Sequence, residues 1–332
     1  MGCNIAVLGA DGAVGRQLVK LLEEYEIPVD KLRLFAGAAG AGQTLLYKGT
    51  DVAIEPIGND AFRGADFVMG AAGAEISAVC APKAVAEGAV YIDNSPCFRH
   101  DPGVPLVVPE INGADAFAHK GILSVPNCTT VITLVAVGGL MKLSPVRSMI
   151  ASSYQAVSGA GQDGIDELEQ QMKALYEGAP LRQKTFAAQI ALNAIPCIGG
   201  YEEKGYTSEE MCLQNEARKI LGQPDLSVTC TCVRVPVLRA HSLSVTLRTD
   251  RKISVEEARE AIAAFPGAAL MPEDAGREWP TPLDASDQDL IYVGRIREDL
   301  TCENGLSLWC CGDQLRKGAA SNAVQILQLL TK

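Results

Sequence analysis

Cys128 has the sequence surroundings of a reactive thiol. It follows Pro126, which ends an extended segment, and the apolar run at residues 131–141 has the length of a buried helix. The thiol is therefore expected near a helix N-terminus, where unpaired N–H groups and the helix dipole favour the thiolate that attacks a carbonyl. A lone cysteine before an apolar helix is more often a small core residue. His241, a possible proton-transfer partner, favours the catalytic interpretation.

A glycine turn near the start of the chain indicates a nucleotide site. A buried strand at residues 4–8 is followed by Gly9, Gly12 and Gly15, which lead into an amphipathic helix at residues 16–22. A strand, a glycine turn and a helix in this order let a pyrophosphate approach the helix N-terminus. The spacing is Gly-x-x-Gly-x-x-Gly rather than Gly-x-Gly-x-x-Gly, so the turn alone leaves the interpretation open.

Two features of this region are unusual for a nicotinamide nucleotide site. Asp11 lies inside the turn, where a carboxylate should repel a pyrophosphate unless it points away or caps the helix. A second strand, at residues 32–36, ends where an adenine ribose would lie, and NAD enzymes usually place an acid there and NADP enzymes an arginine. Residues 37–43 offer neither, although their backbone N–H groups could bind a phosphate. A flexible loop without a ligand is the alternative.

The first part of the chain alternates strands with helices. Apolar strands at residues 66–73 and 89–95 are separated by a helical segment at residues 83–87. This alternation predicts an α/β fold with a Rossmann-type doubly wound parallel sheet. Ligands bind beyond the carboxyl ends of such strands, which places residues 71–73 and 94–99 near a cofactor and a substrate.

The character of the chain changes after Cys128, where an α+β second domain with an antiparallel sheet is expected. Its elements are predicted at residues 149–157 (strand), 163–175 (acidic helix), 227–235 and 242–247 (half-buried strands) and 255–263 (helix capped by Ser254). The predicted domains are residues 1–127, a dinucleotide-binding domain, and residues 128–318, a catalytic, substrate-binding and dimerisation domain. A last helix at residues 319–330 is expected to pack back on the first domain.

Composition narrows the class of protein. The formal charge of −11 argues against nucleic-acid binding, which needs a basic face. The longest apolar run is shorter than the roughly 20 residues of a membrane span, and no secretory signal is recognised, so a cytoplasmic protein is expected. The eleven cysteines are expected to be mostly reduced core thiols, and no Cys-x-x-Cys pair indicates a metal site.

Ordered motifs along nearly the whole chain resemble bacterial aspartate-semialdehyde dehydrogenase. Besides the glycine turn, they are found at residues 93–95, 98–99, 109–112, 126–130, 154–161, 205–207, 234–237, 239–242, 293–297 and 315–320. The resemblance implies interconversion of aspartate 4-semialdehyde plus phosphate and aspartyl 4-phosphate with NADP, on the route to lysine (through diaminopimelate), methionine and threonine. It also implies a homodimer formed through the second domain.

The resemblance assigns a role to individual residues. Cys128 would be the nucleophile that forms a thioacyl intermediate, His241 the general acid/base, and Gln155 the residue that orients the reacting groups. The substrate-binding residues would be Arg99 for the phosphate, Arg239 for the α-carboxylate, Glu209 for the ammonium group, and Asn127. The cofactor-binding residues would be Gly9, Asp11, Gly12, Ala13, Val14, Gly37, Gly40, Ala72, Gly73, Ser158, Gly159 and Gln314.

Four departures from the family pattern affect the predicted site. Cys212 replaces the lysine that shares the phosphate with Arg99, a loss of one charge-assisted contact worth about 1.5–3 kcal/mol. The loop that usually holds the NADP 2′-phosphate with Ser-x-Arg-Ser reads Gly-Ala-Ala-Gly at residues 37–40. Asp11 replaces a threonine, and Gln314 replaces an asparagine that reaches toward the nicotinamide amide.

Three functions are compatible with this pattern. The first is an active aspartate-semialdehyde dehydrogenase whose cofactor preference is weakened or moved toward NAD. The second is a related enzyme with another semialdehyde or acyl phosphate as substrate, since Cys212 and Leu243 alter the pocket lining. The third is a redox-inactive paralogue that serves as a binding subunit, which failure to bind any nicotinamide nucleotide would select.

Overall fold

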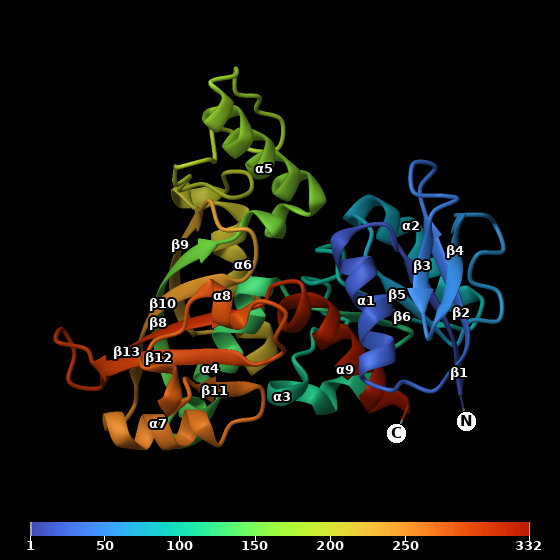
Figure 1. Cartoon of the computed structure of the whole chain (residues 1–332). Coiled ribbons are helices and arrows are strands. Elements are labelled where there is room, and N and C mark those ends of the chain that lie inside the picture. Colours follow the sequence, from blue (N-terminus) through green and yellow to red (C-terminus); the bar gives the residue numbers. More distant parts are fainter. Residues whose placement is uncertain (1, 332) are drawn as a thin grey trace. The chain divides into compact units, whose positions relative to one another are not determined.

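The computed structural model describes residues 2–331, which form two compact units (Figure 1). The first unit contains the described residues up to Asn127 together with those from Ala319 onward. The second contains Cys128–Gly318. The nucleophile predicted from the sequence is thus the first residue of the second unit.

The first unit is built on a seven-stranded sheet with the order β3-β4-β2-β1-β5-β6-β7. Its strands are β1 (Cys3–Leu8), β2 (Val29–Ala36), β3 (Thr44–Tyr47), β4 (Thr50–Pro56), β5 (Phe67–Gly70), β6 (Val90–Asp93) and β7 (Ile122–Ser124). Its helices are α1 (Ala13–Glu24), α2 (Ala74–Ala86), α3 (Pro109–Asn112) and α9 (Ser321–Thr331). Every pair of neighbouring strands is parallel except the β3–β4 hairpin, and the order runs outward in both directions from β1. The predicted doubly wound parallel sheet is confirmed.

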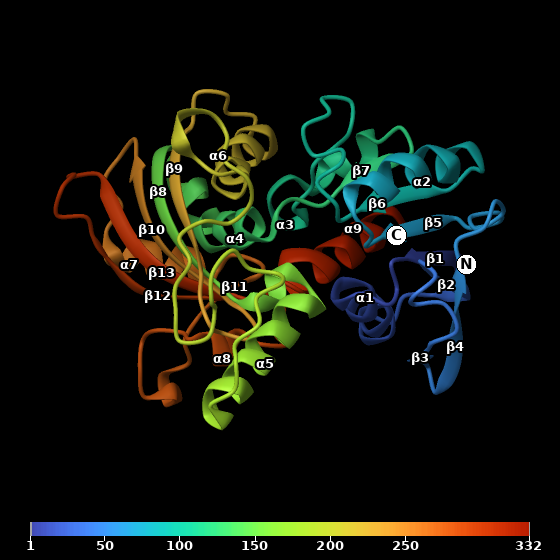
Figure 2. The same ribbon diagram turned by 90° about the horizontal axis from the view of Figure 1, so that it is seen from above.

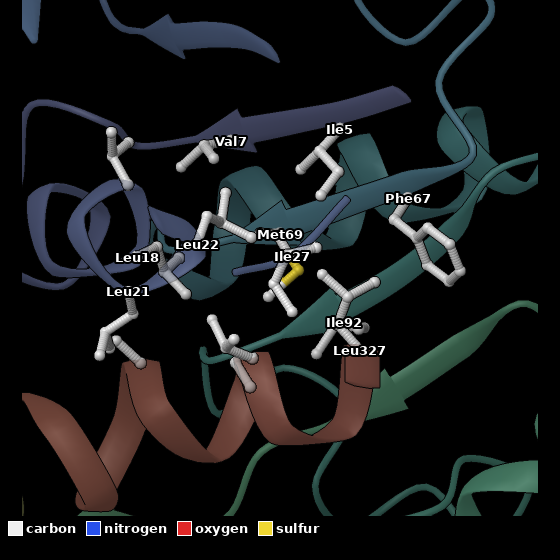
Figure 3. Packing of buried hydrophobic residues seen from close by; sticks show 14 of the residues in the cluster. Ile5, Val7, Leu18, Leu21, Leu22, Ile27, Phe67, Met69, Ile92 and Leu327 are labelled. Carbon is white, nitrogen blue, oxygen red and sulfur yellow. The ribbon is translucent and has the colours of Figure 1, made fainter. Parts of the chain in front are cut away.

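Each face of this sheet has its own hydrophobic core, because successive side chains of a strand point to opposite faces. Ile5 and Val7 of β1 pack with α1 and α9, including Leu327 (Figure 3). Ala6 and Leu8 pack with α2 instead. Figure 2 shows α1 and α2 on opposite faces of the sheet. Burial on both faces explains why the β1 sequence is almost continuously apolar.

The second unit contains a six-stranded sheet with the order β11-β12-β13-β10-β8-β9. Its strands are β8 (Val146–Gln155), β9 (Ser227–Arg234), β10 (His241–Thr249), β11 (Ala268–Leu270), β12 (Ile291–Glu298) and β13 (Gly305–Gly312). Its helices are α4 (Cys128–Leu143), α5 (Gln162–Glu177), α6 (Ser208–Leu221), α7 (Val255–Ala263) and α8 (Pro282–Ala285).

The prediction of an antiparallel sheet is confirmed for the central strands of this unit and is wrong for both edge strands. β10 is antiparallel to β8 and β13, and β12 is antiparallel to β13. The pairs β8–β9 and β11–β12 are parallel. The connection from β8 to β9 contains α5 and α6, and a crossover that contains helices returns the chain in the same direction. The sheet is therefore mixed.

Helix α4 packs against both α6 and α7, and all three helices pack against strands of this sheet (Figure 1). α4 is buried along most of its length, which explains its almost uniformly apolar sequence. On β8, the exposed Ile150 and Tyr154 alternate with buried residues such as Met149 and therefore lie on the other face of the sheet. Ser254 caps α7 with Glu257 in a capping box, as predicted for Ser254.

Candidate active site

Cys128 is the first residue of α4, so the predicted position of the thiol at a helix N-terminus is confirmed. The N-terminal end of a helix and its dipole favour the thiolate form of a cysteine. Gly318 lies directly against Cys128, because a Cβ atom added at Gly318 would be 2.9 Å from the Cys128 Cβ. A side chain at position 318 would displace the thiol.

Gln155 and Glu209 meet beside the helix that begins at Cys128. Gln155 ends β8, and its Nε2 donates a 3.0 Å hydrogen bond to Glu209 Oε1. Thr129 Oγ1 donates to the same oxygen over 3.4 Å. Glu209 is held in the first turn of α6 by the capping box of Thr207. The structure therefore brings the predicted orienting residue and the predicted ammonium-binding acid into one network.

His241 is a fully buried imidazole whose protonation state is set by its surroundings. Its Nδ1 accepts a 3.0 Å hydrogen bond from the Ala156 amide, so the neutral ring has its proton on Nε2. The pKa of His241 is lowered well below 6.5, first by burial and then by the positive charge of Arg234. Within residues 2–331, Nε2 is buried and has no hydrogen-bond partner. The site thus holds a neutral imidazole with an available N–H donor.

Arg234 is a buried cation near His241, Glu209 and Cys128. It ends β9, is 6% exposed, and donates from Nη1 to the Ala156 carbonyl over 2.7 Å. In the part of the chain that the structure describes, its side chain makes no second hydrogen bond. Burial lowers the pKa of Arg234, whereas the nearby charges of Glu209 and Cys128 raise it. A buried guanidinium with most of its donors available is suited to binding an anion.

A cavity of about 300 Å³ adjoins this guanidinium. Its lining includes Arg234, Phe186, Cys197 and Gly199. The guanidinium carbon lies 5.9 Å from the centre of the Phe186 ring. An apolar cavity of this kind with one buried charge is typical of a site for a small anionic molecule.

Arg239, predicted to bind the substrate α-carboxylate, is engaged with carboxylates of its own chain. Its Nε donates to Asp313 Oδ2 over 2.6 Å, and its Nη2 donates to Asp287 Oδ1 over 3.2 Å. Asp313 is fully buried and needs this cation. The sequence analysis assigned no role to Arg234, which the structure pairs with Gln155 in the parallel β8–β9 pair. Both residues end strands that run in the same direction.

Ser158 and Gly159 form part of a 3-10 turn, Val157–Ala160, and Gly159 lies against Arg234 and His241. Gln314 Nε2 donates to Ser158 Oγ, and Gln314 Oε1 accepts from the Ala240 amide over 2.9 Å. A Cβ atom at Gly159 would lie 2.6 Å from Arg234 Nη1. The Gln314 side chain therefore links Ser158 of this turn to Ala240, the residue before His241, and its predicted contact with nicotinamide stays a prediction.

The predicted pyrophosphate-binding residues lie in the first unit. Gly9 has a φ of +80°, and a Cβ added there would lie 2.8 Å from the Ala71 carbonyl group, so the glycine turn packs closely on the loop that contains Ala72. Gly12 and Gly73 are the N-cap residues of α1 and α2, and Ala13 and Val14 begin α1. Neither N-cap has a side chain that would occupy the N–H groups. These two helix starts fit a pyrophosphate.

Arg99 is buried in the first unit and bonded to two strand ends. Its Nε donates to the Val125 carbonyl over 3.0 Å, and its Nη2 donates to the Asn94 carbonyl over 2.9 Å. Asn127 is also buried and directly precedes Cys128. Cys212, at the position of the missing lysine, is half-buried on α6 one turn after Glu209.

All eleven cysteines are free thiols, and six of them are buried, as expected for reduced core residues. Across the described chain, no group of three or more His, Cys, Asp or Glu side chains could hold a metal ion. None of the helices between residues 2 and 331 is long and apolar enough to cross a membrane.

A doubly wound sheet with glycine N-caps, followed by a unit that begins with a thiol at a helix N-terminus, fits a nicotinamide-linked oxidoreductase that acts on an aldehyde. Comparison with known proteins agrees. Residues 4–119 match the semialdehyde dehydrogenase NAD binding domain, and residues 137–317 match the semialdehyde dehydrogenase dimerisation domain.

Full-length relatives identify the family within this class. The aspartate-semialdehyde dehydrogenase of Aquifex aeolicus is 43% identical over 100% of this chain and 99% of its own, and that of Bacillus subtilis is 40% identical over 100% and 98%. The crystal structure of aspartate semialdehyde dehydrogenase II from Vibrio cholerae complexed with ASA has a TM-score of 0.97 and 38% identity, and covers 100% of this chain and 98% of that one. The chain belongs to the aspartate-semialdehyde dehydrogenase family.

Proposed function

We propose that the protein interconverts aspartate 4-semialdehyde plus phosphate and aspartyl 4-phosphate, with a nicotinamide nucleotide and through a thioacyl group on Cys128. The observation that supports the substrate most directly is the buried Arg234 beside Cys128 and Glu209, since an amino acid offers a carboxylate for the cation and an ammonium group for the acid. The proposal includes a role in the biosynthesis of lysine, methionine and threonine, as the family name suggests.

In the oxidative direction, the Cys128 thiolate adds to the aldehyde carbon and forms a C–S bond, while the carbonyl oxygen takes the negative charge. The Nε2–H group of His241 can donate a hydrogen bond to that oxyanion, because Nδ1 is already bonded to the Ala156 amide. When bound, the nicotinamide nucleotide supplies the acceptor for the hydride that leaves the substrate carbon. Phosphate then attacks the thioacyl carbon, the C–S bond breaks, and Cys128 leaves as the thiolate.

The same geometry refines the roles predicted from the sequence. In this proposal Arg234, not Arg239, binds the α-carboxylate, and Glu209 binds the ammonium group with support from Gln155. Arg99 keeps its proposed role toward the phosphate. His241 acts as a neutral donor in the free enzyme, because its lowered pKa makes the imidazolium form scarce near pH 7.

The chain contains an NAD(P)-binding domain, and the identity of the preferred nucleotide is part of the proposal. The glycine turn fits the pyrophosphate common to both nucleotides. The loop at residues 37–43 has no cation for a 2′-phosphate, so we propose that NADP binding is weakened relative to the family expectation.

We also propose a homodimer formed through the second unit, in the cytoplasm. The family model for this region is a dimerisation domain, and Ile150 and Tyr154 leave apolar area exposed on one face of its sheet. Free thiols suit a reducing compartment. A monomer mass in solution at micromolar concentration would exclude the dimer.

The reaction is tested with Cys128→Ala. Phosphate-dependent oxidation of aspartate 4-semialdehyde should be lost, while titration with the nucleotide should give nearly the wild-type affinity. Cys302→Ala, also a half-buried cysteine of the second unit, is the matched control and should keep full activity. Activity in Cys128→Ala would refute the mechanism. Turnover of a different semialdehyde only would indicate the second function considered above, and failure to bind either nucleotide would indicate the redox-inactive one.

A further inference from the structure

The carboxylate of Asp11 lies against the loop that follows β2. A Cβ atom added at Gly40 would be 2.5 Å from Asp11 Cγ and still closer to Asp11 Oδ2. No side chain larger than hydrogen fits at position 40 while Asp11 keeps this position. The N-cap of α1 is Gly12, so the carboxylate does not cap the helix. Within residues 2–331 it accepts no hydrogen bond.

Arg16 fixes the contact between the turn and the loop. Its Nε donates to the main-chain oxygen of Asp11 over 3.0 Å, and its Nη2 donates to Gln43 Oε1 over 2.8 Å. One side chain therefore joins the β1–α1 turn to the end of residues 37–43. Gly40 and Ala41 N–H groups are bonded to the Gly37 carbonyl, which closes the loop on itself. Asp11 is thus held at the edge of the loop with its carboxylate available.

We propose that Asp11 is the residue that determines cofactor specificity, accepting a hydrogen bond from the adenine ribose of NAD and repelling the 2′-phosphate of NADP. In a Rossmann-type sheet the ribose lies beyond the end of β2, where NAD enzymes place an acid. This chain has no acid in residues 37–43 and supplies one from the neighbouring turn. Gly40 supports this assignment, because only glycine leaves room for the carboxylate.

The negative charge of Asp11 favours NAD over NADP. The 2′-phosphate has a charge between −1 and −2 near neutral pH, like other phosphate monoesters. Residues 37–43 contain no lysine or arginine to offset it, and Ala39 is exposed where a cation could stand. Arg16 of α1 donates instead to the Asp11 main-chain oxygen and to Gln43 Oε1. The ribose 2′-hydroxyl of NAD can instead donate to the carboxylate.

The inference rests on the proposed function, in that the first unit must bind a nicotinamide nucleotide. The experiment is a binding titration of the full-length protein with NADH and with NADPH in the absence of substrate. The fluorescence of the nucleotide reports binding. The wild type should bind NADH at least about tenfold more tightly than NADPH, the ratio expected from one hydrogen bond to a charged group. Asp11→Asn should reduce that ratio about tenfold by weakening NADH and strengthening NADPH.

Asp51→Asn is the matched control, because Asp51 is exposed on β4 of the same unit and its change alters the net charge equally. It should leave both affinities unchanged. Ala39→Arg is a second test at an exposed position, which does not depend on how Asp11→Asn folds, and it should strengthen NADPH binding alone. The inference is overturned if the wild type prefers NADPH, or if Asp11→Asn changes the ratio no more than Asp51→Asn. Absence of binding by either nucleotide would instead overturn the proposed function.

Discussion

Replacement of Arg234 by methionine tests which arginine recognises the substrate. Methionine keeps a long apolar side chain in the buried position and removes the cation. A hydrogen bond to a charged group contributes about 1.5–3 kcal/mol, and 1.4 kcal/mol corresponds to a factor of ten, so the KM for aspartate 4-semialdehyde should rise roughly 10- to 150-fold. The value of kcat should change less, because the carboxylate is bound both before and during the chemical step.

A truncated substrate makes this prediction specific to the carboxylate. 3-Aminopropanal is the same aldehyde without its α-carboxylate group. For the wild-type enzyme, the KM should be higher for 3-aminopropanal than for aspartate 4-semialdehyde by a similar factor. For Arg234→Met, the two KM values should be almost equal, as a double-mutant cycle gives for two groups in contact. Steady-state kinetics at saturating nucleotide and phosphate give all four values.

Arg239→Met is the matched comparison. It leaves the buried Asp313 without its cation, so this variant should mainly have a lower free energy of unfolding. Discrimination between the two aldehydes should persist in this variant. The reasoning is refuted if Arg239→Met abolishes that discrimination while Arg234→Met preserves it.

Two further predictions concern the surroundings of His241. Gly159→Ala puts a Cβ atom 2.6 Å from Arg234 Nη1 and 3.0 Å from His241 Nε2, so kcat/KM should fall at least about tenfold. Gly58→Ala is the control in steady-state assays, because its Cβ meets no atom within 4 Å. Equal activity in the two variants would contradict the close packing around Gly159. Because the pKa of His241 is lowered in the folded state, the unfolded state binds its proton more readily, and stability should fall below about pH 6.5 by up to about 1.4 kcal/mol per pH unit. Urea unfolding of the wild type and of His241→Asn at pH 7.5 and 5.5 checks this, and an equal pH dependence in the two proteins would contradict it.

The sequence predicted the elements of the fold well because their signals are local. The glycine turn, the helix that begins at Cys128 and the Ser254 cap each depend on a few consecutive residues. The direction of the edge strands in the second unit has no local signal, because it depends on which strands become neighbours. Residues 227–235 alternate equally well as a parallel or an antiparallel strand. Only the helices inserted between β8 and β9 indicated the parallel arrangement.

The proposal assigns the α-carboxylate to Arg234 rather than to the predicted Arg239, and the sequence did not separate the two for a related reason. Arg234 and Arg239 are five residues apart, and both lie in segments that match the family. Their positions in sequence do not reveal that one meets the buried Asp313 while the other ends a strand beside Gln155. Likewise, the contact of Asp11 with Gly40 joins two turns that are far apart in the chain. Such contacts follow from the register of the sheet and from the packing of loops.

In the proposed mechanism, Arg234 also connects substrate binding with the protonation of His241. Its charge is one cause of the lowered pKa of His241, and burial is the larger one. A substrate carboxylate bound to Arg234 would offset that charge, so the pKa of His241 should be higher in the complex than in the free enzyme. Burial keeps part of the shift in place, and the imidazole therefore stays mainly neutral until an oxyanion forms near Nε2. In the proposed mechanism, binding of the carboxylate therefore raises the pKa of His241 before the step in which the substrate oxygen becomes charged.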